Sequence, residues 1–296
     1  MKTIEYLSDP ALRSIFLPGV LAGLAIAIFG GVLSVFVVMK RLAFIGQGIS
    51  HAAFGGVGVA YVLGLGGAAA GGLGAGAFGA QFAIVFAFCL LAALQVGLLT
   101  GGDAGRRKRS QADTAIGIVL VASMAIGSLL LHMAEKGGRG ATVSWESLLF
   151  GSIVGVGVAD AWACGFIGTV ILAVLFVLRR PMTFWAFDEA AAAAYGVRAG
   201  LMRVALLILL ALATVTAMKL AGVVLATAML VLPAATAVQF SRTAAGAFVW
   251  SVLFAVVSVA LGIVMSFELD WPTGASIVLV LSALFGAGWI KARVAG

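Results

Sequence analysis

The sequence predicts an all-α membrane protein: a polytopic bundle of eight or nine transmembrane helices with one short helix on the cytoplasmic side. Of the 296 residues, 63% are hydrophobic and only 10% are charged, whereas a soluble domain is about half apolar and a quarter charged. The apolar residues also fall in long uncharged runs, and roughly 20 such residues are enough to cross a bilayer. We therefore expect a single transmembrane domain over residues 1–296 and exclude a water-soluble globule.

Charged and turn-forming residues divide the chain into nine candidate spans. The division at Lys219 is the least distinct, because residues 199–241 could instead form a broken helix that does not fully return, which would leave eight spans. The nine candidates cover approximately residues 14–39, 43–64, 77–100, 113–133, 153–178, 199–217, 220–241, 245–267 and 273–290.

The basic residues predict the orientation of these spans. Cytoplasmic loops carry an excess of Lys and Arg. With the N-terminus outside, thirteen of the 18 basic residues fall on the inner side of the nine-span arrangement. We therefore expect an outer N-terminus and a cytoplasmic C-terminus. The net charge of +7 is then a property of cytoplasmic loops, and no nucleic-acid partner is expected.

The second candidate span carries polar side chains that are costly in lipid and so point to function. His51 follows Gln47 by four residues, which places both on one helical face, with Ser50 alongside. Imidazole binds zinc and other first-row transition metals, and an amide oxygen is a weak ligand. This set is too small for a tight closed site but suits a transport site that must release its ion. The alternative is that His51 only hydrogen-bonds a neighbouring helix.

Other polar residues lie near the ends of spans. Asp113 opens the fourth span, where a carboxylate can cap the helix start at the cytoplasmic face. His132, beside Glu135, is expected to be a solvated histidine at the outer end of that span. Asp160, near the start of the fifth span, has no role that the sequence identifies.

The longest inner connection, residues 179–203, is expected to contain a short helix over about residues 187–197. This stretch is rich in Ala, a strong helix former. Asp188 and Glu189 fall in the first turn, where the helix dipole favours acids. Gly196 suits the helix end. Such a helix could dock a soluble partner or only connect two spans.

In the seventh candidate span, residues 220–241, Pro233 is expected to kink the chain, because proline removes a backbone hydrogen bond. Kinked helices often line transport pathways, although packing alone could also explain the proline. The sequence contains no phosphate-binding loop, nucleophile elbow or hydrophilic domain. We therefore expect no enzymatic activity and no energy source within the chain.

Four segments, in order, resemble one family: the membrane permease subunits of ATP-binding-cassette importers for zinc, manganese or iron. They are residues 41–52 with the glycines that follow, 113–117, 188–197 and 222–237. The resemblance covers nearly the whole chain. It implies a metal site in the permeation path at His51, with Gln47 and Ser50. It also implies that residues 187–197 are the coupling helix, which docks on an ATPase through Asp188, Glu189 and Gly196.

The resemblance also implies the partners and the substrate. Two permease copies, expected to be identical, form the pathway in a bacterial-type plasma membrane and its lipids. Two cytoplasmic ATPase subunits bind ATP, and an extracytoplasmic binding protein delivers the ion. The substrate is a divalent metal ion, and no cofactor is bound permanently. Family members often carry Asp at the position of Gln47, so zinc, which suits imidazole and neutral oxygen, is expected ahead of manganese and iron.

Three other functions stay open at this point. A secondary transporter or channel would need no ATPase. Its proton-coupled form would need a series of carboxylates within the membrane, which the predicted spans lack. A membrane scaffold fits the composition but not the four ordered segments. An importer of metal chelates would need a wider pathway.

Overall fold

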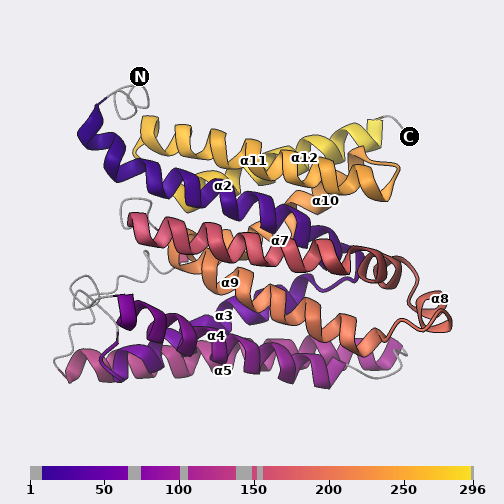
Figure 1. The fold of residues 1–296 in the computed structure, drawn as a ribbon, viewed down its shortest axis with the longest axis horizontal. Helices are drawn as coiled ribbons and strands as arrows, with labels where there is room; N and C mark the ends of the chain where they lie inside the picture. Colours follow the sequence, from indigo (N-terminus) through magenta and orange to yellow (C-terminus); the bar gives the residue numbers. More distant parts are fainter. Residues whose placement is uncertain (1–8, 66–74, 101–105, 138–148, 152–155, 295–296) are drawn as a thin grey trace. The chain divides into compact units, whose positions relative to one another are not determined.

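The computed structural model describes residues 9–65, 75–100, 106–137, 149–151 and 156–294. Within these ranges the chain is almost entirely helical and contains no strand, which confirms the all-α prediction (Figure 1). The helices are α2 (Pro10–Met39), α3 (Ala43–Val62), α4 (Ala75–Thr100), α5 (Arg106–Lys136), α7 (Val158–Phe187), α8 (Glu189–Ala194), α9 (Ala199–Met229), α10 (Leu232–Phe240), α11 (Ala244–Leu269) and α12 (Thr273–Val294).

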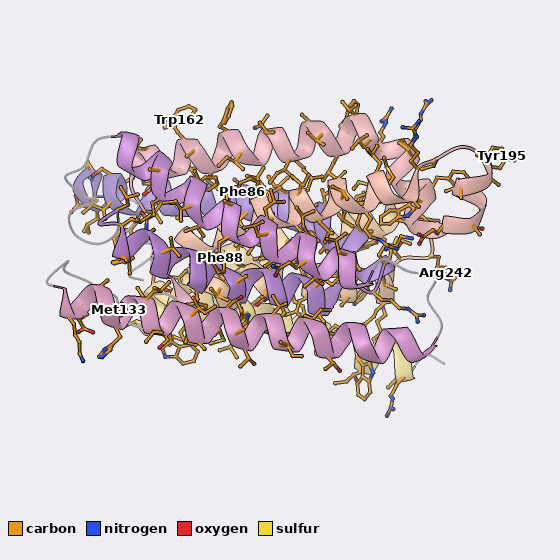
Figure 2. The ribbon with its side chains drawn as sticks, turned by 90° about the horizontal axis from the view of Figure 1, so that it is seen from below. Phe86, Phe88, Met133, Trp162, Tyr195 and Arg242 are labelled. Carbon is orange, nitrogen blue, oxygen red and sulfur yellow. The ribbon has the colours of Figure 1, made fainter. Side chains whose placement is uncertain are left out.

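Eight helical stretches within the described ranges are long and apolar enough to cross a membrane. Large apolar side chains on them are exposed, among them Trp162 on α7 and Met133 on α5, which lie on the outside of their helices in Figure 2. Exposed apolar surface of this kind is expected where helices face lipid. The chain is therefore a multi-pass membrane protein, as predicted. Helix α3, which carries the predicted metal ligands, is 20 residues long but is not one of the eight.

Two helix ends differ from the predictions. Helix α5 begins at Arg106, because the Arg, Lys, Gln and Ala of the basic segment are all good helix formers. Asp113 therefore lies about two turns inside the helix, and the prediction that it begins the helix was wrong; its side chain is outside the described part of the structure. Helix α7 continues through Pro181 to Phe187, well beyond the predicted end of the fifth span.

The chain divides into two compact units. The α2 unit comprises Met1–Ala43, Glu146–Glu189 and Thr216–Gly296, and the α3 unit comprises Phe44–Trp145 and Ala190–Val215. In the α2 unit, α2 packs against α7, α10 and α11, and α12 packs against α10 and α11. In the α3 unit, α4 packs against α5.

A close helix crossing organises the core of the α2 unit. A Cβ added to Gly31 of α2 would lie 3.0 Å from the Val252 Cα of α11. The buried hydroxyls of Ser34 and Ser251 both donate to the Gly31 carbonyl oxygen, at 2.8 and 2.7 Å. Small residues let two helices approach closely, and the hydroxyls form hydrogen bonds that lipid cannot supply.

Residues 199–241 contain two candidate spans, Ala199–Met218 and Gly222–Phe240, which matches the division at Lys219 in the nine-span prediction. The helix is nevertheless broken at two places. Gly222 has the non-helical angles φ 73° and ψ 169°, and the helix stops at Met229 and restarts at Leu232. Pro233 is the second residue of α10, a position where its missing N–H costs nothing. The proline therefore marks a new helix start rather than the kink within a continuous helix that the sequence predicted. The side chain of Lys219 lies outside the described part.

Candidate functional site

Helix α3 is held in its unit by contacts at glycine. A Cβ added to Gly58 would lie 2.9 Å from the carbonyl oxygen of Gly127 on α5. A Cβ added to Gly55 would overlap the ring of Phe88 on α4, which is marked in Figure 2. These contacts place α3 against both α4 and α5. They explain why a helix that carries polar residues is also rich in glycine, since the backbones must nearly touch.

His51 is half-buried on α3, and its Nδ1 lies 2.9 Å from the carbonyl oxygen of Gln47, one turn earlier. A carbonyl oxygen can only accept, so Nδ1 carries the proton and donates it. The Nε2 atom then keeps its lone pair, which is the form of imidazole that binds metal ions. In the described structure this bond is within α3, and the alternative of a hydrogen bond from His51 to a neighbouring helix is not observed.

Gln47 and His51 lie one turn apart on the same helical face, whereas the Ser50 side chain is buried. The Gln47 side chain is exposed one turn before the His51 ring. The Ser50 side chain is fully buried, and its Oγ has no hydrogen-bond partner among the described residues. The Gln47 side chain is therefore accessible from outside the protein, whereas the Ser50 hydroxyl is not. The described residues include no group of three or more His, Cys, Asp or Glu side chains that could hold a metal.

Helix α8 is shorter than the predicted coupling helix. It is preceded by Asp188, which is extended (φ −140°) and ends α7. It is followed by Gly196 in the left-handed conformation (φ 83°). The N–H groups of Gly196 and Val197 donate to the carbonyl oxygens of Ala193 and Ala192, at 3.0 and 2.9 Å. This pattern is a Schellman motif, and it confirms that Gly196 ends the helix.

Lys40 makes two contacts near α8 that no pattern in the sequence predicted. The Nζ of Lys40 lies 2.8 Å from the Glu189 Oε2 and 4.0 Å from the centroid of the Trp185 ring. All three residues belong to the α2 unit. At the other end of α8, Tyr195 is 82% exposed and stands at the tip of its segment in Figure 2.

Asp160 and His132 are the two polar residues for which the sequence predicted no binding role. Asp160 Oδ2 accepts a hydrogen bond from the Gly157 N–H at 3.1 Å and so caps the start of α7. Its position three residues after the cap is the signal that could have identified this role. His132 is exposed near the end of α5, as expected of a solvated histidine.

Comparison with known proteins identifies the family. Residues 13–292 match the family described as the ABC 3 transport family. The chain belongs to this family. It is 32% identical to the "Manganese transport system membrane protein MntC" of Halalkalibacterium halodurans, over 96% of this chain and 90% of that protein. It is also 28% identical to the "Probable iron transport system membrane protein" of Haemophilus influenzae, over 95% of each.

A solved structure supports the same assignment. "PsaBC from Streptococcus pneumoniae in complex with Fab" superposes with a TM-score of 0.78 at 26% identity, covering 97% of this permease and 94% of that chain. The ABC 3 chain is therefore the membrane permease of an ABC-type metal importer.

Proposed function

We propose that this permease moves a divalent transition-metal ion across the plasma membrane into the cytoplasm, and that His51 binds the ion transiently on its way. The observation that carries the proposal is the hydrogen bond from His51 Nδ1 to the Gln47 carbonyl oxygen. It presents Nε2 as a free ligand on the face that the Gln47 amide also occupies. A site of one imidazole and one amide oxygen binds weakly, which suits an ion that must leave again.

The identity of the transported metal depends on which ligands it prefers. Manganese favours oxygen ligands such as carbonyls and water, whereas zinc and iron suit imidazole. The relatives described above are named for manganese and iron transport. We therefore place manganese first and keep zinc, the expectation from the ligand types alone, as the second candidate.

The proposed importer uses partners that supply the energy. Two copies of the permease form the pathway, and two ATPase subunits bind ATP and dock on α8 through Asp188, Glu189 and Gly196. An extracytoplasmic binding protein delivers the ion, and the C-terminus lies in the cytoplasm. The broken helix before Pro233 is proposed to line the pathway, because interrupted helices leave backbone carbonyls free for ions.

The test of the ligand is metal uptake by His51→Ala, with His132→Ala as the matched control. These are the chain's two histidines, and His132 is exposed near a helix end. Loss of a ligand worth more than about 1.4 kcal/mol lowers affinity at least about tenfold. We expect His51→Ala to lower uptake at low metal concentration by that factor while the complex still assembles, and His132→Ala to transport normally. Unchanged uptake by His51→Ala would remove the assignment.

The test of the metal is ATPase activity in the complex reconstituted with its binding protein. Manganese, iron and zinc are added in turn, and the cognate ion should stimulate hydrolysis most. Uptake that continues without ATP would instead favour a secondary transporter.

A further inference from the structure

We propose that Lys40, Trp185 and Glu189 form a clasp that fixes the start of α8 to the end of α2, and that this clasp passes movement of α8 on to α2. The inference rests on the proposed function of α8 as the docking helix for an ATPase. It assigns Glu189 a contact within the permease, and it makes Lys40 a positioning residue for coupling.

The clasp is built around one ammonium group. Lys40 Nζ is 2.8 Å from Glu189 Oε2 and 4.0 Å from the Trp185 ring centroid, so the charge lies between a carboxylate and an aromatic face. The Lys40 side chain is only 12% exposed, whereas Glu189 is 45% exposed. An ion pair in which both side chains are exposed contributes little to stability. A cation that is partly desolvated and lies over an aromatic ring is bound more strongly.

The aromatic wall of the clasp has no other polar contact in the described structure. Trp185 is 1% exposed, and its Nε1 has no hydrogen-bond partner there. A buried indole N–H normally finds an acceptor. In the described structure no hydrogen bond from Nε1 sets the orientation of the ring. The polar contact of the ring is the one between its face and the Lys40 cation.

Backbone hydrogen bonds at the end of α2 fix the position of Lys40. Lys40 directly follows α2, which ends in a Schellman motif: Arg41 N–H donates to the Val38 carbonyl oxygen at 3.1 Å, and Leu42 N–H to that of Val37 at 2.8 Å. This motif holds Lys40 in place at the helix end.

The other half of the clasp spans the joint between two helices. Trp185 lies in the last turn of α7, and Glu189 is the first residue of α8. Between the two helices only Asp188 is non-helical. A single side chain from α2 thus contacts the residues before and after the joint, so α8 cannot swing about Asp188 without breaking one of the two contacts.

Both partners of the ion pair belong to the α2 unit, whose second segment ends at Glu189. A movement of Glu189, the first residue of α8, is therefore passed through the ion pair to Lys40 at the end of α2.

The experiment measures metal transported per ATP hydrolysed by the complex in proteoliposomes. Lys40→Ala and the conservative Lys40→Arg are compared with Lys291→Ala. Lys291 is the matched control, because it also lies over a ring, 5.0 Å from the Phe240 centroid, but forms no ion pair in the described structure.

We expect Lys40→Ala to retain ATP hydrolysis while transport per ATP falls about fivefold or more, the usual scale of a coupling energy. Lys40→Arg keeps the charge and should stay near wild type, as should Lys291→Ala.

Several results would overturn the clasp. Normal coupling in Lys40→Ala would do so, because Glu189 would then act on the ATPase without Lys40. If Lys40→Ala does not assemble, Lys40→Met keeps the length of the side chain without its charge, and normal coupling in that variant has the same meaning. A wild-type complex whose ATPase ignores every metal would instead contradict the proposed function and not the clasp.

Discussion

Gly222 is the position where the broken helix depends most on glycine. Its angles, φ 73° and ψ 169°, belong to a region that only glycine occupies readily. A Cβ at this position would lie 2.5 Å from the Gly151 nitrogen and closer still to the Leu149 carbonyl oxygen, where 3.4 Å begins ordinary contact. Replacing Gly222 with Ala therefore combines a strained backbone with an overlap against main-chain atoms.

The expected cost follows from these two effects. A residue held in such a backbone region costs about 1–3 kcal/mol. The segment of residues 149–151 would also have to retreat by roughly 1 Å, and forced backbone shifts of this kind cost about 1–3 kcal/mol more. We expect Gly222→Ala to destabilise the permease by about 2–6 kcal/mol.

Thermal unfolding of the purified permease in detergent measures this loss. For a chain of this size each kcal/mol moves the Tm by about 2–4 °C, so the Tm should fall by at least about 4 °C. Gly286→Ala is the control, because Gly286 lies within α12 and its added Cβ meets nothing within 4 Å. Alanine in a helix interior should be neutral or stabilise by about 0.5–1 kcal/mol. If the two variants melt alike, the break at Gly222 does not depend on glycine and the reasoning fails.

Two further substitutions test the end of α2 and the candidate site. Arg41 closes α2 with φ 57°, a conformation that costs a non-glycine residue about 1–2 kcal/mol, so Arg41→Gly should raise the Tm; a lower Tm would mean that the Arg41 side chain contributes more than the strain costs. Gln47→Asp adds a carboxylate beside His51, which favours manganese. In competition uptake the ratio of manganese to zinc should rise several-fold, and an unchanged ratio would place Gln47 outside the ion's path.

Long helices and their local ends were predictable from the sequence for physical reasons. A chain that crosses lipid must satisfy its backbone within each helix, so uncharged runs translate directly into helices. The end of α8 was equally local, because Gly196 needs only its own left-handed conformation and the two preceding turns. The start of α5 was misjudged at Asp113, since the charges that end a membrane span do not end a helix.

The contacts that were missed depend on residues far apart in the chain. Lys40 and Glu189 are separated by 149 positions, and neither is unusual in its own segment. Gly222 was one of many glycines within spans, and its conformation is explained only by the approach of Gly151 and Leu149. Local patterns predict where helices begin and end, whereas the contacts that hold a broken helix or a joint arise from packing.

The candidate site shows how packing and chemistry are connected in α3. Gln47, Ser50 and His51 reduce its apolar character, so burial in lipid alone stabilises it less than the other long helices. Its stability must come from close contacts, and Gly55 and Gly58 provide them by admitting α4 and α5 to the backbone. Gly55 and Gly58 follow His51 by four and seven residues and lie on the same helical face as Gln47 and His51. The close contacts therefore hold the second half of α3, and Gln47 and His51 lie on the turns before them. A helix held by its backbone can therefore offer its side chains to a passing ion.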